Sequence, residues 1–184
     1  MDYLFDSKEF KDYLGDLRNK IIRNGIYNPN NEDIEVLFKR YFFKKLSIDE
    51  DKMRIIGNSK KTSNMSMRTI VRIPYTGSGD LFNYHTSPCY PASSAKIIGH
   101  ADLRKNTLDI EIIANANNSA EDNKRLLNQK ISRLKEYINW VNDDIINVNN
   151  SIKSLILSNI KSKKEHVKKT ERFANSFGLP VEKQ

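Results

Sequence analysis

The most regular pattern of apolar and polar positions lies in the last third of the chain. Apolar residues recur there at alternating steps of four and three, a 3.5-residue period typical of a helix with one apolar seam, as in coiled coils. A cap at Ser119 and a stop at Gly178 predict helix over 119–178. The "VNNS" run near Asn149 leaves two interpretations open, one long helix or a helical hairpin. The seam consists of Leu127, Ile131, Leu134, Ile138, Val141, Ile145, Val148, Ile152 and Leu155.

The first 46 residues also show helical spacing. One amphipathic segment covers 7–24, with Ser7 as its expected cap and Gly25 after it. A second begins after Asn30 or Asn31 and reaches about Lys45. We therefore predict a helical region over 1–46.

The pattern changes in the middle of the chain to short, β-branched runs separated by turn residues. Four runs (52–57, 67–75, 94–103 and 106–114) predict an antiparallel sheet of about four strands within 51–114. The last two are expected to form a hairpin, and 74–94 is expected to be a long crossover loop. The expected fold class is α+β, in a single domain over 1–184.

The charge is uneven. The chain carries a formal net charge of +8, with ten basic and three acidic residues over 39–72 and six basic and two acidic residues over 161–172. Such clusters attract polyanions, although a solvated helix face and a basic loop explain them more simply. The predicted nucleic-acid-binding residues are Lys39, Arg40, Lys44, Lys45, Lys161, Lys163, Lys164 and Lys168. Aromatic residues interleave with the first cluster in "FKRYFFKK", where they suit base stacking or a core stripe.

Candidate chemistry is sparse. The glycines of "TGSGDLF" lack the lysine of a phosphate-binding loop. His85, Cys89 and His100 lack the spacing of a metal site, and Cys89 as a nucleophile has little support. Asp109 and Glu111 share one strand face, but Ile113 stands where a metal-dependent nuclease would use lysine. We predict no catalytic residue, no metal and no cofactor.

The segment 73–91 is better explained as a connection of fixed shape. Its prolines and glycines restrict the backbone, and Leu81, Phe82 and Tyr84 are expected to anchor it to the core.

Composition limits the location of the chain. A single cysteine excludes an internal disulfide, and the first residues do not have the pattern of a secretion signal. No apolar run reaches the roughly 20 residues that span a bilayer. A cytoplasmic protein without membrane segments is expected.

Three segments resemble a family of bacterial proteins. "VRIPYTGSGDLFNYHTSP" (71–88), "ISRLKEYINWVNDDIINVNNSI" (131–152) and "FANSFGLPV" (173–181) are similar to motifs of an N-terminal region that precedes a restriction-endonuclease-like nuclease domain. The likeness covers roughly 68–181. The catalytic Asp and Glu-x-Lys of that family would lie downstream of Gln184, so no catalytic role carries over.

The resemblance implies a non-catalytic sensing, recruitment or assembly module of a nuclease-type effector, in bacterial defence against foreign DNA. The alternative is a stand-alone nucleic-acid-binding domain. A small sheet is too narrow to cover the whole seam, so part of it is expected to contact other helices of the chain or a second copy in a homodimer.

Overall fold

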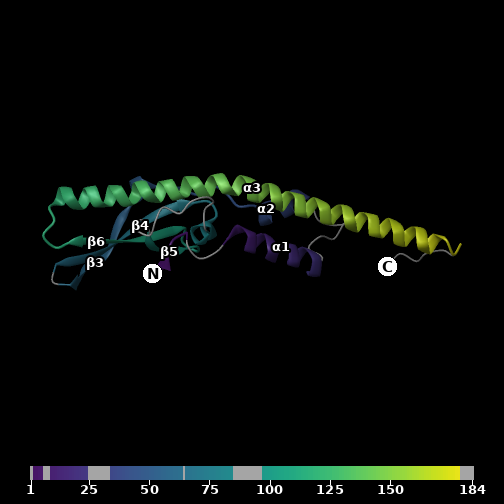
Figure 1. Cartoon of the computed structure of the whole chain (residues 1–184), viewed down its shortest axis with the longest axis horizontal. Helices are drawn as coiled ribbons and strands as arrows, with labels where there is room; N and C mark the ends of the chain where they lie inside the picture. Colours follow the sequence, from purple (N-terminus) through teal and green to yellow (C-terminus); the bar gives the residue numbers. More distant parts are fainter. Residues whose placement is uncertain (1, 6–8, 25–33, 64, 85–96, 179–184) are drawn as a thin grey trace. The chain divides into compact units, whose positions relative to one another are not determined.

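The computed structural model describes residues 2–5, 9–24, 34–63, 65–84 and 97–178, and it confirms the α+β fold class (Figure 1). In chain order the elements are β1 (Asp2–Tyr3), α1 (Phe10–Asn24), α2 (Ile34–Tyr41), β2 (Ser47–Ile48), the 3-10 turn η1 (Glu50–Lys52), β3 (Arg54–Ser63), β4 (Ser66–Thr76), the 3-10 turn η2 (Gly79–Asn83), β5 (Ile98–Asp102), β6 (Thr107–Asn115) and α3 (Ala120–Asn175).

Among the described residues the sheet is antiparallel and has six strands, in the order β1-β5-β6-β4-β2, with β3 also paired to β4. The four long strands correspond to the four predicted runs. Strands β1 and β2 have two residues each, too few for an alternating pattern to reveal. The hairpin of β5 and β6 is confirmed, with Asp102 opposite Thr107.

Several predicted boundaries were wrong. Strand β1 lies within 1–46, which was predicted to be helical, β2 precedes the predicted sheet region 51–114, and β3 continues to Ser63, beyond the predicted run 52–57. The crossover does not begin at Pro74, because β4 continues to Thr76 and pairs Pro74 with Thr107. Helix α2 ends at Tyr41 instead of Lys45. Residues 85–94 of the crossover, with Ser7, Gly25, Asn30 and Asn31, lie outside the described residues.

Helix α3 is continuous, so the hairpin interpretation was wrong. It passes through Asn149 and ends at Asn175, and Gly178 then adopts a φ of 66° in the turn that follows. Val148, just before the expected break, and Ile152, just after it, are both buried. Their burial favours a helical backbone more than asparagine disfavours it.

The single domain expected from the sequence contains two compact units. The sheet unit comprises Met1–Phe10 and Phe43–Asn147, and the helical unit comprises Lys11–Phe42 and Val148–Gln184. Helix α3 contributes residues to both.

In the sheet unit, the first part of α3 covers one face of the sheet (Figure 1). Inward-facing residues of β4 and β6 pack there with the first half of the seam, and Phe5 stacks on Tyr137 with ring centroids 5.3 Å apart. This core includes Val71, Ile73, Tyr75, Leu108, Ile110, Ile112, Ile131, Leu134, Ile138, Val141 and Ile145.

In the helical unit, the buried positions of α3 run Val148, Ile152, Ile156, Ile160, at steps of four. The heptad pattern assigned Leu155 to the seam instead. A straight helix has 3.6 residues per turn, so its buried stripe drifts away from a strict 3.5 period. Leu17 of α1 and Leu37 of α2 complete the described core.

This burial changes the expectation of a homodimer. The Ile152 side chain is 0% exposed within the chain, so it is not available for contact with a second copy. A homodimer would have to use other residues.

The segment after β4 has the structural role expected of it. Leu81, Phe82 and Tyr84 are buried. Gly77 adopts a φ of 99°, and Ser78 bonds Lys44 twice, through its backbone N–H (3.1 Å to the Lys44 oxygen) and its Oγ (2.8 Å from the Lys44 nitrogen). The segment therefore holds the backbone that leads into β2.

Candidate functional site

The clearest charged feature of the helical unit is a basic stripe near the end of α3. Lys161, Lys164, Lys168 and Arg172 follow one another at steps of three, four and four, which places them on one side of a helix. All four side chains are exposed, and none forms an ion pair with another described residue. At 1.5 Å per residue the stripe extends over about 16 Å. We call these four residues the basic stripe.

The stripe differs from the predicted set by two residues. Lys163 lies on another side of the helix, is partly buried and already contacts another residue, so the structure does not group it with its neighbours. Arg172 belongs to the stripe but was not among the predicted binding residues. Its helical spacing from Lys161 would have allowed Arg172 to be predicted from sequence.

The N-terminal basic residues are divided between the two compact units. Lys39 and Arg40 lie exposed on α2 in the helical unit, where Arg40 has a partner. Lys44 and Lys45 are exposed in the sheet unit, in the irregular segment before β2. We therefore give these four residues no shared role.

The aromatic residues of this stretch are partly engaged in internal packing. Phe38 and Phe42 stack on each other at 5.0 Å, and the Tyr41 carbonyl accepts a 3.2 Å hydrogen bond from the Tyr13 hydroxyl. The side chains of Phe38, Tyr41 and Phe42 are all half-buried. They leave little free ring surface for base stacking.

Asp109 and Glu111 are engaged by arginines on the outer face of the sheet, the face away from α3. Asp109 accepts two hydrogen bonds of 2.7 Å from Arg72, which raise the pKa of that arginine. Arg68 forms an ion pair with Glu111, with Nε 2.7 Å from Oε1. These cross-strand ion pairs occupy the carboxylates that a metal ion would need.

No group of three or more metal-ligating side chains occurs among the described residues. His100 is exposed on β5, and His85 and Cys89 lie outside the described residues.

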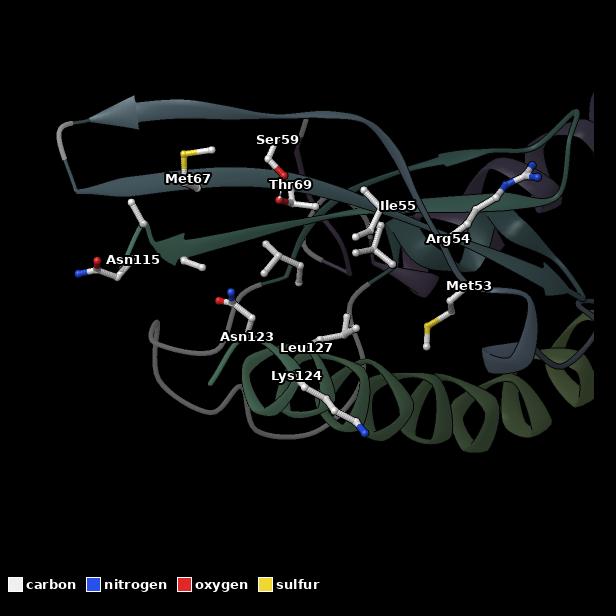
Figure 2. A pocket seen from close by; sticks show the side chains of 14 residues that line it. Met53, Arg54, Ile55, Ser59, Met67, Thr69, Asn115, Asn123, Lys124 and Leu127 are labelled. Carbon is white, nitrogen blue, oxygen red and sulfur yellow. Dashed lines mark hydrogen bonds between the residues drawn. The ribbon is translucent and has the colours of Figure 1, made fainter. Parts of the chain in front are cut away.

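A pocket of about 480 Å³ lies between the inner face of the sheet and the first turns of α3. Figure 2 shows Ile55, Met67 and Thr69 on the sheet side and Asn123 and Leu127 on the helix side. Ser59 and Thr69 share a 2.6 Å hydrogen bond between their hydroxyls.

The pocket has no carboxylate or imidazole in its lining. Two cations belong to its rim, Arg54 and Lys124, and their charged ends point away from the enclosed space (Figure 2). The pocket can hold an apolar group, but it supplies no group for acid–base chemistry.

Comparisons with protein-family models, with curated proteins and with solved structures gave no match. The family likeness stated above therefore rests on the three sequence motifs alone. Within the part of the chain that the structure describes, every helix is too short or too polar to cross a membrane.

Proposed function

We propose that this chain is a non-catalytic module that binds nucleic acid and thereby recruits a nuclease-type effector, in cytoplasmic defence against foreign DNA. The observation that carries the proposal is the basic stripe. Four exposed cations on one side of a helix, none paired with a described carboxylate, form a linear array that suits a linear polyanion.

The expected contact is with phosphates. Lysine and arginine side chains on a helix bind the backbone of any sequence, and each neutralised phosphate releases counterions. Binding through the stripe should therefore be independent of sequence and sensitive to salt.

The ion pairs on the sheet support a non-catalytic role. Arg72 and Arg68 engage Asp109 and Glu111, and Ile113 stands where a nuclease would use lysine. A catalytic metal would have to displace both arginines.

The link to a nuclease rests on the motif resemblance. The coding sequence beyond residue 184 tests it. An Asp followed by Glu-x-Lys there would support an effector, whereas a stop codon would favour the stand-alone nucleic-acid-binding domain.

Nucleic-acid binding is tested by reversing the charge of Lys161, Lys164 and Lys168 to glutamate in the full chain. We expect weaker binding to a labelled DNA duplex, with a slope of log affinity against log salt that flattens by about three. Fluorescence anisotropy over a salt series measures both quantities.

A matched control separates the stripe from net charge. Lys20, Arg104 and Lys124 are exposed and have no ion pair with a described residue. Reversing these three to glutamate changes the net charge equally and should leave the slope close to that of the wild type. Equal losses in the two variants, or no binding by the wild type at low salt, would contradict the proposal.

A further inference from the structure

The outer face of the sheet sets cations directly opposite each other on β3 and β4. The register pairs Arg54 with Arg72 and Lys60 with Arg68. Partners in an antiparallel register point to the same face with Cβ atoms about 4.5–5.5 Å apart. Like charges in this arrangement repel, so the free protein tolerates two unfavourable pairs.

Only the β4 member of each pair has a carboxylate. Arg72 binds Asp109 and Arg68 lies against Glu111, both on β6. Arg54 and Lys60 are exposed on β3 and form no ion pair with a described residue. Strand β3 has β4 as its only neighbour among the described strands, so these two cations lie along the edge of the sheet.

We infer that Arg54 and Lys60, each with the arginine opposite it, form a second contact for a nucleic-acid backbone. An oxyanion between two opposed cations removes their repulsion and accepts charge-assisted hydrogen bonds from both. A phosphodiester has two such acceptor oxygens, one for the cation of each strand, and a carboxylate has two as well. The assignment to phosphate therefore rests on the repeat of the cation pairs along the sheet.

The geometry also fits a repeating anion. Arg68 and Arg72 are four residues apart on β4, about 14 Å at 3.4 Å per residue. Two oxyanions of one backbone, separated by that distance, could occupy the two pairs. Ile56 and Ile70 lie opposite each other between the pairs, and no aromatic residue of β3, β4 or β6 faces outward there. The contact should therefore read phosphates and not bases.

This inference rests on the proposed function, and Lys60→Glu in the full chain tests it separately. We expect the slope of log affinity for the labelled DNA duplex against log salt to flatten by about one. We also expect the Tm to rise by about 1–3 °C, because a glutamate at position 60 would lie opposite Arg68. If Lys60→Glu is more stable but binds DNA more weakly, Lys60 acts in binding, because loss of a residue needed only for folding would lower stability.

The adjacent Lys61 supplies the control. It is exposed on the same strand but is paired with Met67, so it points to the other face. Lys61→Glu makes the same change in charge. It should not flatten the salt slope, and it should not raise the Tm. Equal effects of the two substitutions on binding would overturn the inference.

Two other outcomes separate the proposals. If Lys60→Glu binds DNA normally while reversal of the basic stripe weakens binding, the proposed function stands and this contact is wrong. If the wild type binds polyglutamate through Lys60 but not DNA, the surface recognises acidic polypeptide and the assignment to nucleic acid is overturned.

Discussion

Gly77 holds a position in which backbone conformation and space both exclude a side chain. Its φ is 99°, and a Cβ atom would collide with the carbonyl oxygen of Lys45. The sequence predicts that this glycine lies in a turn. It does not reveal the contact with Lys45, 32 positions away, that leaves no room for a side chain. Gly15 differs in both respects, since it lies within α1 and a Cβ atom there would meet nothing within 4 Å.

The two glycines should respond to alanine in opposite directions. Gly77→Ala should lower the free energy of unfolding by about 2 kcal/mol or more, because strain and the collision with Lys45 add. Gly15→Ala should raise it by about 0.5–1 kcal/mol, since alanine favours the helix. Urea denaturation followed by circular dichroism measures both. Destabilisation by Gly15→Ala would show that α1 is not helical at that residue.

At the scale of elements, the fold class and the four long strands could be predicted because each carries its own periodicity. Helix α3 shows the limit of this approach. Its heptad pattern located the buried side as far as Ile152. The burial of Ile156 instead of Leu155 follows from the 3.6 residues per turn of an α-helix, which drift against a strict 3.5-residue repeat. The two-residue strands β1 and β2 exist only because longer strands pair with them.

The same reasoning applies to the candidate site. Lys161, Lys164 and Lys168 could be grouped from sequence because their spacing is helical. The separation of Lys44 and Lys45 from α2, which carries Lys39 and Arg40, could not be predicted from sequence. The helical pattern gave no sign that α2 ends at Tyr41, before the two lysines. The opposition of Lys60 and Arg68 depends on a register shift between Ile56 and Lys60, which no local pattern reveals.

One residue joins α3 to the segment before β2. Asn142 Oδ1 accepts a 2.7 Å hydrogen bond from the Leu46 N–H, and its Nδ2 donates a 2.8 Å bond to the Leu46 carbonyl. Leu46 is 2% exposed, so water reaches neither backbone group easily.

Asn142→Ala should therefore destabilise the sheet unit by about 2 kcal/mol, because it leaves a buried N–H and a buried C=O without partners. Asn139 lies one turn earlier on α3 and is exposed, so Asn139→Ala should change stability by less than about 0.5 kcal/mol. Chemical denaturation of the two variants gives the comparison. Similar small changes in both would mean that Leu46 is not held by α3.

At the scale of the whole molecule, the two compact units raise the question of whether the chain unfolds in one step. Each unit has its own buried residues on α3, with Ile138 in the sheet unit and Ile152 in the helical unit. Units with separate cores often open separately, with different free energies. The shared helix does not prevent this, because a helix can lose its last turns while the rest stays folded.

Alanine at the two positions should reveal two cooperative units. Truncating a buried isoleucine costs about 2–5 kcal/mol through lost packing. Ile152→Ala should accelerate amide hydrogen exchange in α1, in α2 and in α3 from Val148 onward, while β4 and β6 keep their protection. Ile138→Ala should accelerate exchange in the sheet first. Leu157→Ala, at a residue 41% exposed, is the control and should change neither region. Equal acceleration in both units by either core variant would show a single cooperative domain.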